Sequence, residues 1–446
     1  MKKLKTIIFF SFINLIFNYV IYLNFSSFNS NNNNNTNKNI INNLLNTNIN
    51  TEICIGDPKQ CNKFLIDINF YAFFIVSKDT KNIKNISNKF NQNLSETFSI
   101  NSYENHYYSP YFQYGTESND LIHLKTIENE EIFMNDTDFL LVNELSSYEE
   151  VINKFEYFSG NIGLGIFDYN ELSCSFKINY GFVYSLKKEK IIDNNIFFFK
   201  FDKNEKKNGK LFFGEKPHNL FPYEFKYENY IEKRASSYFV TIHWVIEIDS
   251  MFFGYENFKN NLTYFLFDVQ NGMIRADGYF KEIVDRNFFN KEIKKGNCFE
   301  IIEDYIYYYC NKKANFNNFK DLKFYSHSYN YTFVFNKDEL FYSYENKKYF
   351  LIYFPNSNDS KSNNWILGTI FLKKYLFVFN QDKRTIGYYK IIPSNNNLFI
   401  VWLLIIICFF IIILLGSYIL IYRPGKLRKK RLNEIDDEYE YNVQKI

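Results

Sequence analysis

The stretch FLIDINFYAFFIV, residues Phe64–Val76, is a run of bulky apolar side chains that contains one carboxylate, Asp67. Short runs rich in Phe, Ile and Val predict a β-strand that is buried in a core. An ionised aspartate buried without partners is costly, so a strand of this kind normally excludes one. Asp67 is therefore the first candidate functional residue of the chain.

A second stretch of the same kind, YFLFDVQNGM at residues 264–273, places Asp268 in similar apolar surroundings. The two stretches lie in different halves of the chain, which indicates an internal duplication with one carboxylate in each half. Taken alone, each aspartate also fits an ordinary loop position at the end of a strand. Two carboxylates that meet can share one proton, so that one acts as a base toward water and the other as an acid toward a carbonyl. Together they predict a site for acid–base chemistry.

The region around these stretches, residues 51–390, is rich in short Val, Ile, Phe and Tyr runs separated by Asn, Asp and Gly. This pattern is typical of a protein dominated by β-strands. Two segments are candidate helices, Ser146–Phe155 and Tyr279–Phe289. A region of about 340 residues is too long for one small core, so we expect an N-terminal lobe at residues 51–205 and a C-terminal lobe at residues 206–390.

Both ends of the chain carry signals for a membrane. Residues 1–24 combine the lysines of MKKLK with an apolar run from Ile7 to Leu23, which predicts a secretory signal peptide or, in the alternative, an uncleaved signal anchor. Residues 398–422 carry no charge and are long enough to span a bilayer as a transmembrane helix. Basic residues follow at once in the predicted cytoplasmic tail, residues 423–446. We therefore expect a single-pass type I membrane protein of the secretory pathway or cell surface, with a lumenal or extracellular ectodomain.

Composition excludes a nucleic-acid partner and indicates one region that is not a domain. The net charge of +3 comes from the lysines of the signal region and from the basic tail, so the region between them is slightly acidic. No basic face for phosphate contacts is left after this correction. Residues 25–50 contain the run Asn31–Asn35 and are of low complexity, which predicts a polar spacer that buries no core.

The cysteines agree with an oxidising compartment. Cys54 and Cys61 flank a Gly-Asp-Pro turn, and Cys298 and Cys310 are the other close pair, so both pairs are candidate disulfides. Cys174 is left without an assigned partner. The chain has no Cys-x-x-Cys, no His-Glu-x-x-His, no phosphate-binding glycine loop with Lys-Ser/Thr and no Gly-x-Ser-x-Gly. We therefore expect no metal site and no cofactor, and paired carboxylates remain as the chemistry to consider.

Several short segments, read in order along the chain, carry a resemblance to one family. They are IGDPKQCNKFLID at residues 55–67, FQYGTES at 112–118, FSGNIGLG at 158–165, NGKLFFGEKP at 208–217, HWVIEIDSMFFG at 243–254 and WILGTIFLKKYLFVFNQDKRTIGYYK at 365–390. The chain resembles the pepsin-like (A1) aspartic peptidases, and in particular plasmepsin-like, membrane-anchored members. Each segment is short, but their order and spacing cover the whole ectodomain. The resemblance implies a bilobal, mainly β fold of the pepsin type with a cleft between the lobes.

Carried across position by position, the resemblance implies that Asp67 and Asp268 are the two catalytic aspartates of a peptidase. It implies that Tyr114, Gly115 and Thr116 belong to the flap, the hairpin that closes over a bound peptide. The partner implied by this arrangement is a peptide or protein ligand in the cleft between the lobes.

The chain departs from the family at the residues that follow both aspartates. The family has Asp-Thr/Ser-Gly at both sites, and the second and third positions differ here: Ile68, Asn69, Val269 and Gln270. In the family the threonine hydroxyls bond to the other lobe and hold the carboxylates coplanar, so we expect these cross-lobe bonds to be lost and the site to be repacked as apolar. We expect Gln270 to resist the backbone geometry that glycine allows. Phe70 replaces a small hydroxyl residue that usually supports the first aspartate.

These departures lead us to expect a catalytically impaired pseudoprotease that binds a peptide or protein partner. The alternative within the same family is an active aspartic endopeptidase of an acidic secretory compartment, because both aspartates are present. A third hypothesis is a sorting receptor or adhesion protein, in which the acidic tail Glu434–Gln444 with its two tyrosines engages trafficking adaptors. The sequons at Asn93 and Asn261 are candidate glycosylation sites.

Overall fold

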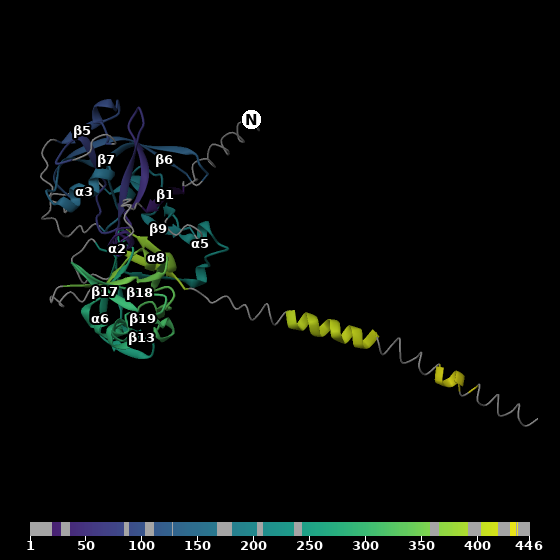
Figure 1. Cartoon of the computed structure of the whole chain (residues 1–446). Coiled ribbons are helices and arrows are strands. Elements are labelled where there is room, and N and C mark those ends of the chain that lie inside the picture. The colour runs from purple at the N-terminus through teal and green to yellow at the C-terminus, as the bar shows by residue number, and fades with distance from the viewer. Residues whose placement is uncertain are drawn as a thin grey trace, which may run out of the picture. The chain divides into compact units, whose positions relative to one another are not determined.

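The computed structural model describes residues 20–27, 36–83, 89–102, 111–126, 128–166, 181–202, 208–235, 243–356, 365–390, 403–417, 429–433 and 435 (Figure 1). The chain divides into two units, Met1–Lys390 and Ile391–Ile446. The first unit contains every strand and both candidate aspartates, so the site is a property of this unit.

The largest sheet has thirteen strands. Its order is β11 (Tyr230–Arg234), β26 (Thr385–Tyr389), β25 (Phe377–Asn380), β9 (Ile196–Phe201), β10 (Asn208–Phe213), β1 (Ile21–Ser27), β2 (Ile49–Ile55), β3 (Gln60–Asp67), β8 (Gly160–Gly163), β4 (Phe74–Lys81), β7 (Glu131–Leu145), β6 (Phe112–Lys125) and β5 (Ser99–Ser102). Most neighbours are antiparallel, but β3 pairs with β8, and β4 with β7, in parallel. Strands from both halves of the sequence meet where β25 pairs with β9, so this sheet joins the two lobes.

Two further sheets belong to the second half of the chain. The nine-stranded sheet contains β12 (Val245–Ile248), β15 (Thr263–Phe267), β24 (Trp365–Leu367), β16 (Ile274–Arg275), β23 (Ile352–Pro355), β18 (Tyr305–Asn311), β22 (Lys347–Phe350) and β21 (Phe341–Tyr344), with β17 (Cys298–Ile302) paired to β18. The four-stranded sheet contains β14 (Glu256–Lys259), β13 (Ser250–Phe253), β19 (Leu322–Ser326) and β20 (Tyr331–Phe335). β15 pairs with β24 in parallel, which repeats the β3–β8 arrangement of the first lobe.

The helices described within the first unit are short. They are α2 (Asn37–Leu45), α3 (Glu149–Tyr157), α4 (Phe182–Lys188), α5 (Pro217–Leu220), α6 (Gly278–Val284), α7 (Asn290–Lys294) and α8 (Thr369–Lys374), with single turns η1 (Gln92–Leu94), η3 (Tyr227–Asn229), η4 (Asp285–Phe289) and η5 (Phe316–Asn318). The two candidate helices of the sequence are confirmed as α3 and as α6 continued by η4. In α3 the residues Val151 and Phe155, four apart, are buried, which is the spacing of one helix face.

The two lobes are packed together through aromatic side chains. Figure 1 shows one lobe with β5–β7 and α3, another with α6, β13 and β17–β19, and β9 and α8 between them. Trp244 packs against Phe197 and Phe379, at ring-centre distances of 5.9 and 5.2 Å. Its indole N–H donates to the Leu164 carbonyl oxygen at 2.9 Å, so the one polar atom of this ring is satisfied.

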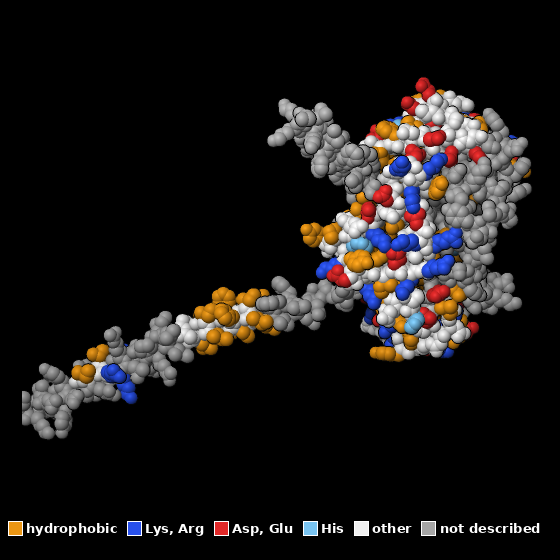
Figure 2. All heavy atoms as spheres, turned by 180° about the vertical axis from the view of Figure 1, so that it is seen from behind, with side chains coloured by type: hydrophobic (Ala, Val, Ile, Leu, Met, Phe, Trp, Pro, Cys, Tyr) orange, Lys and Arg blue, Asp and Glu red, His pale blue; other side chains and the backbone are white. Residues whose placement is uncertain are grey.

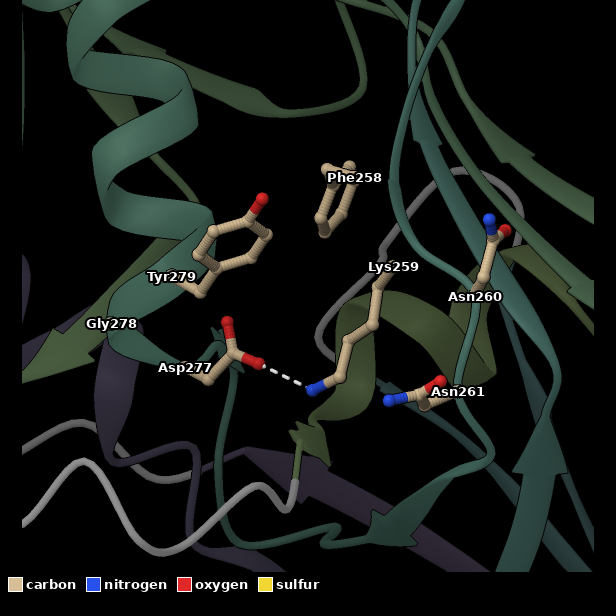
Figure 3. Close-up of a pocket in the computed structure, with 7 residues that line it drawn as sticks. All are labelled: Phe258, Lys259, Asn260, Asn261, Asp277, Gly278 and Tyr279. Carbon is tan, nitrogen blue, oxygen red and sulfur yellow. Dashed lines mark hydrogen bonds and ion pairs between the residues drawn. The ribbon is translucent and has the colours of Figure 1, made fainter.

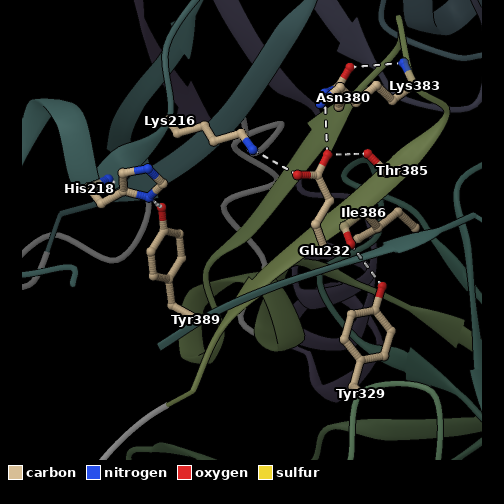
Figure 4. A network of polar contacts seen from close by, with 9 residues as sticks. All are labelled: Lys216, His218, Glu232, Tyr329, Asn380, Lys383, Thr385, Ile386 and Tyr389. Atoms are coloured by element: carbon tan, nitrogen blue, oxygen red, sulfur yellow. Dashed lines mark hydrogen bonds and ion pairs between the residues drawn. The ribbon is translucent and has the colours of Figure 1, made fainter. Parts of the chain in front are cut away.

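A polar network lies where β11 meets β25 and β26 (Figure 4). Glu232 accepts hydrogen bonds from Lys216 Nζ at 2.7 Å, from Asn380 Nδ2 at 3.3 Å and from the Thr385 hydroxyl. Burial works against the charge of Glu232, but the bonds from Lys216 and Thr385 outweigh burial and lower the pKa of its carboxyl. A paired charge therefore ties the edge strand β11 to the sheet that joins the lobes.

The N-terminal part of the chain contributes more to the fold than its composition predicts. β1 starts at Ile21, inside the predicted signal peptide, and lies between β10 and β2 with Ile21 and Phe25 buried. Helix α2 follows, and its Ile41 lies in one apolar cluster with Tyr353 of β23. The prediction of a spacer without a core at residues 25–50 is therefore wrong, because apolar residues at strand and helix spacing occur among the asparagines.

Both candidate disulfides are confirmed. Cys54 joins Cys61 across β2 and β3, and Cys298 joins Cys310 across β17 and β18. Each pair is directly opposite in the register of its hairpin, which brings the sulfur atoms within bonding reach. Cys174 lies outside the described residues.

The second unit contains a helix at residues 403–417 whose side chains are largely hydrophobic and exposed (Figure 2). Among the residues that the structure describes, no helix has the length and apolar character needed to cross a membrane. The predicted signal peptide up to residue 19, both ends of the predicted span 398–422 and most of the acidic tail lie outside the described residues.

Candidate active site

Asp67 is the last residue of β3, where the strand leaves the sheet. The Leu164 N–H, which follows β8, donates to the Asp67 carbonyl oxygen at 2.7 Å. The Asn69 N–H turns back and donates to Asp67 Oδ1, also at 2.7 Å. Asp67 is only 4% exposed. The strand pair and the following turn therefore hold its carboxylate in one orientation.

Asp268 follows β15 directly and repeats this arrangement in the second lobe. Its N–H donates to the Leu367 carbonyl oxygen of the parallel strand β24 at 3.0 Å. The Gln270 N–H donates to Asp268 Oδ1 at 2.9 Å. Both aspartates thus stand at the end of a parallel strand pair and accept the N–H two residues on. This supports the internal duplication predicted from the sequence.

One glycine packs closely against the loop that follows each aspartate. A Cβ atom at Gly163 would lie 2.5 Å from the Ala72 nitrogen, and one at Gly368 would lie 2.1 Å from the Met273 oxygen. Real Cβ atoms do not approach other atoms this closely. These glycines belong to the segments GNIGLG and WILG, so the residue type is required by close packing of the loop that follows each aspartate.

The two carboxylates act on each other electrostatically. Burial raises the pKa of Asp268 to about 6, and the negative charge of Asp67 adds to this effect. The backbone N–H groups of Gln270 and Asn271 work in the opposite direction, as does the charge of Lys154. Burial is the larger of the two causes, so the raised pKa reports chiefly on the surroundings of Asp268 and only second on the charge of Asp67. Asp67 therefore lies close enough to Asp268 for its charge to act on that carboxyl.

Tyr111, which precedes β6, is a site residue that the sequence did not reveal. Its hydroxyl donates a hydrogen bond to Asp67 Oδ2. Its ring packs against Phe70, Phe74 and Phe155 at centre distances of 5.5, 5.8 and 5.8 Å. Burial raises the pKa of Tyr111 well above its usual range, and the Asp67 charge and hydrogen bond add to this, so the phenol stays protonated and donates.

The lobes are connected beside the aspartates by side chains outside the family's threonine positions. The Thr47 hydroxyl donates to the Val269 carbonyl oxygen at 3.0 Å. The Gln270 side-chain amide donates to the Ile66 carbonyl oxygen and, at 3.3 Å, to the Ile49 carbonyl oxygen. Ile68 and Val269 have no hydroxyl with which to make the threonine bonds of the family, but different cross-lobe hydrogen bonds are present in their place. Thr47 and Gln270 supply donors that Ile68 and Val269 cannot.

The predicted apolar repacking is confirmed at positions 68 and 269. Ile68 and Val269 are completely buried and belong to the main hydrophobic core. Neither Asn69 nor Gln270 has a positive φ, so the backbone at these positions does not require glycine. The prediction that Gln270 resists the local geometry is wrong, because a glutamine in ordinary conformation still donates its N–H to Asp268.

The predicted flap residues lie on β6, which forms a long hairpin with β7. Tyr114 is opposite Glu144, Gly115 is opposite Val142, and the register shifts on both sides of Tyr114. The Thr116 hydroxyl accepts a hydrogen bond from Asn143 Nδ2 at 2.5 Å. The hydroxyl that reaches Asp67 from this part of the chain comes from Tyr111 rather than from the predicted Tyr114.

Two cationic or titratable side chains lie near the pair. The Lys154 ammonium, on α3, is 5.6 Å from the centre of the Tyr111 ring. Burial lowers the pKa of His243, while the Asp67 charge works in the opposite direction, which places the imidazole within reach of the Asp67 field. No simple sequence pattern connects Lys154 and His243 to the aspartates, because they come from two segments that are far from Asp67 in the sequence.

A cavity of about 360 Å³ lies in the second lobe, away from the residues that hold the aspartates (Figure 3). It is lined by Phe258, Lys259, Asn260, Asn261, Asp277, Gly278 and Tyr279. The Lys259 ammonium and the Asp277 carboxylate form an ion pair at 2.8 Å on its wall. The one group of potential metal ligands among the described residues, Glu52, Cys54 and Cys61, has both its sulfur atoms in a disulfide.

Comparison with known proteins agrees with this geometry. A family model described as eukaryotic aspartyl protease matches residues 49–391, which covers both lobes and both aspartates. A search of curated proteins found no match.

Proposed function

Because the chain belongs to the eukaryotic aspartyl protease family, we propose that it is a catalytically impaired member, a pseudoprotease that binds a peptide or protein partner between its lobes. The fold and the two aspartates of the family are retained. The proposal concerns what these two carboxylates still do.

The surroundings of Asp67 are the observation that carries the proposal. Both of its carboxylate oxygens accept hydrogen bonds from the protein, Oδ1 from the Asn69 N–H and Oδ2 from the Tyr111 hydroxyl. The residue is 4% exposed. Two protein donors and near-complete burial leave this carboxylate little access to a catalytic water. The same carboxylate still offers lone pairs to a polar group of a bound chain.

The groups that position the pair in the family are also different here. Ile68 and Val269 have no hydroxyl, and both side chains are completely buried in the core. The cross-lobe bonds from Thr47 and Gln270 end on backbone carbonyl oxygens, so they join the lobes without touching either carboxylate. Misplacement of a catalytic group by about 1 Å can lower the rate about a hundredfold, so a protein can keep the fold of an enzyme and lose its activity.

The test uses the full-length protein and a peptide library, from about pH 4 to about pH 7, which brackets the pKa of about 6 for Asp268. We expect no cleavage, together with saturable binding of a peptide that carries a statine-type hydroxyl and contacts both carboxylates. We expect Asp67→Ala to abolish that binding. Asp338→Ala, at an exposed aspartate of the second lobe, is the matched control and should bind as the wild type does.

The second candidate function is an active aspartic endopeptidase, and one observation favours it. The pKa of Asp268 is raised to about 6 by burial and by the Asp67 charge, so this carboxyl still carries its proton in mildly acidic solution. One carboxylate is then ready to act as acid and the other as base. Cleavage of library peptides that disappears in Asp67→Ala but persists in Asp338→Ala would establish this function and overturn the first.

We further propose a membrane-anchored protein of the secretory pathway, with its ectodomain lumenal or extracellular. Two disulfides in the first unit support an oxidising compartment. The uncharged residues 398–422 and the basic residues after them support a single-pass anchor with a cytoplasmic tail. Protease protection of intact vesicles tests this: the ectodomain should be protected while an epitope added at Ile446 is removed.

A further inference from the structure

Tyr111 replaces a hydroxyl that the chain has lost elsewhere. Position 70, three residues after Asp67, is a phenylalanine, where the family resemblance leads one to expect a small hydroxyl residue that supports the first aspartate. In the structure a hydroxyl reaches the same carboxylate from a distant segment, since Tyr111 donates to Asp67 Oδ2. The ring of Phe70 packs directly on the ring of Tyr111, at 5.5 Å and nearly perpendicular to it. Phe70, which has no hydroxyl of its own, thus helps to orient the hydroxyl of Tyr111.

The Tyr111 hydroxyl is held in place by its ring. Phe70, Phe74 and Phe155 surround it from three elements, and the Phe74 ring is itself packed against Phe155 at 5.4 Å. A side chain packed in this way loses little further entropy when its hydroxyl makes a hydrogen bond. The bond to Asp67 is therefore preorganised.

The two aspartates differ in one respect that follows from Tyr111. Each accepts the backbone N–H two residues on, from Asn69 and from Gln270. Asp67 receives a side-chain hydroxyl in addition, whereas the hydrogen bonds that lower the pKa of Asp268 come, among the described residues, from the backbone N–H groups of Gln270 and Asn271. A hydroxyl donor favours the ionised form of the carboxylate that it touches. The pair is thus asymmetric although its backbone is symmetric.

We propose that Tyr111 is the positioning residue of the carboxylate pair: its hydrogen bond fixes the Asp67 carboxylate and directs the proton of the pair to Asp268. The pair then presents an acceptor, Asp67, and a donor, Asp268. A ligand group that both donates and accepts, such as a hydroxyl or a backbone amide of an extended peptide, matches this pattern. This ligand assignment rests on the proposed binding function, whereas the role of Tyr111 within the protein does not.

Other charged or titratable groups act on the pair and must be held constant in any test. Among the described residues they are Lys154 of α3, His243 before β12 and Tyr353 of β23, and Glu150 of α3 acts on Tyr111 itself. The substitution Tyr111→Phe leaves all of them in place and removes a single oxygen atom.

The experiment follows the aspartate carboxyl carbons by NMR in isotope-labelled full-length protein without ligand, with the Asp268 signal assigned from Asp268→Asn. At about pH 5 we expect a largely protonated Asp268 in the wild type, given its pKa of about 6. In Tyr111→Phe we expect the proton to redistribute toward Asp67, with a change of about ten- to a hundredfold in its preference between the two sites. The Asp268 signal then loses protonated character at the same pH.

A matched control is Tyr329→Phe, which removes another buried hydroxyl hydrogen bond, to the Ile386 carbonyl oxygen, far along the chain from the pair. It should leave the Asp268 signal unchanged. The double variant Phe70→Ser, Tyr111→Phe restores a hydroxyl at position 70, and it should return the proton to Asp268. An Asp268 signal that is the same in Tyr111→Phe and in the wild type would overturn the proposal.

Ligand binding separates this proposal from the proposed function. If the statine-type peptide does not bind the wild type, while Tyr111→Phe still shifts the Asp268 signal, the binding function fails and the role of Tyr111 stands. If the peptide binds with the same pH dependence in both proteins and the Asp268 signal does not move, the function stands and the role of Tyr111 fails.

Discussion

Replacement of Asp268 by asparagine removes a charge that the folded protein must otherwise place beside Asp67. The pKa of Asp268 is raised from 3.8 to about 6, chiefly by burial and next by the charge of Asp67. The folded protein therefore binds this proton more tightly than the unfolded chain does. Stability from this group is fully present below about pH 4 and is lost as the pH rises through 6.

The size of this effect follows from the shift. Each unit of pKa difference corresponds to 1.36 kcal/mol, so a shift of about two units makes the wild type about 3 kcal/mol less stable at pH 7 than at pH 4 through this group alone. Asparagine carries no charge at either pH. We therefore expect Asp268→Asn to gain stability relative to the wild type across this range, by about 3 kcal/mol.

The assay is urea unfolding of both proteins at a series of pH values, followed by tryptophan fluorescence. Trp244 and Trp365 are fully buried and report on the core. Only the difference between the two proteins is used, because other groups titrate in both. The control is Asp277→Asn, which removes the charged partner of Lys259 and should lower stability at neutral pH.

The result that refutes this reasoning is a difference in unfolding free energy between Asp268→Asn and the wild type that does not change with pH. Such a result means that Asp268 is not buried beside a second charge, and the paired site itself is then in question. A difference that grows as the pH falls refutes the sign of the linkage in the same way.

Two further predictions concern stability at neutral pH. The buried ammonium of Lys89 donates to the carbonyl oxygens of Phe155 and Phe158 at 2.7 and 2.6 Å, at the C-terminal end of α3. Lys89→Met should therefore lower the free energy of unfolding by about 1–3 kcal/mol, whereas Lys294→Met, at an exposed lysine, should lower it by less than about 0.5 kcal/mol. Equal effects of the two substitutions in urea unfolding would contradict the capping role of Lys89. The Gln270 amide joins the lobes, so Gln270→Ala should cost about 1–3 kcal/mol and should make proteolysis between the lobes faster at unchanged temperature; unchanged proteolysis would show that the cross-lobe bond contributes nothing.

Much of the fold could be predicted because it depends on residues that are close in sequence. The disulfide of Cys54 and Cys61 spans a single hairpin with a sequence separation of 7, so the turn alone brings the sulfurs together. Helix α3 follows from apolar residues four apart. The positions of Asp67 and Asp268 at the ends of strands follow from apolar runs that stop at a polar turn.

The prediction for the N-terminal segment is the main one that the fold contradicts. An asparagine-rich composition predicts a solvated spacer. The structure uses the few apolar residues within it, and Ile41 of α2 packs into a cluster that contains Tyr307 and Tyr353 of the second lobe. Composition averages over residues, whereas packing depends on which of them face the same side.

The sequence by itself determined that two aspartates end equivalent strands, that their triplets lack hydroxyls and that the cysteines pair within hairpins. Tertiary structure alone decided what surrounds the aspartates. The hydroxyl on Asp67 comes from Tyr111, 44 residues away, and the cross-lobe bonds of Thr47 and Gln270 join residues separated by 222 and 204 positions. Hydrogen bonds require donor and acceptor within about 3 Å, and only the folded chain brings such distant residues that close.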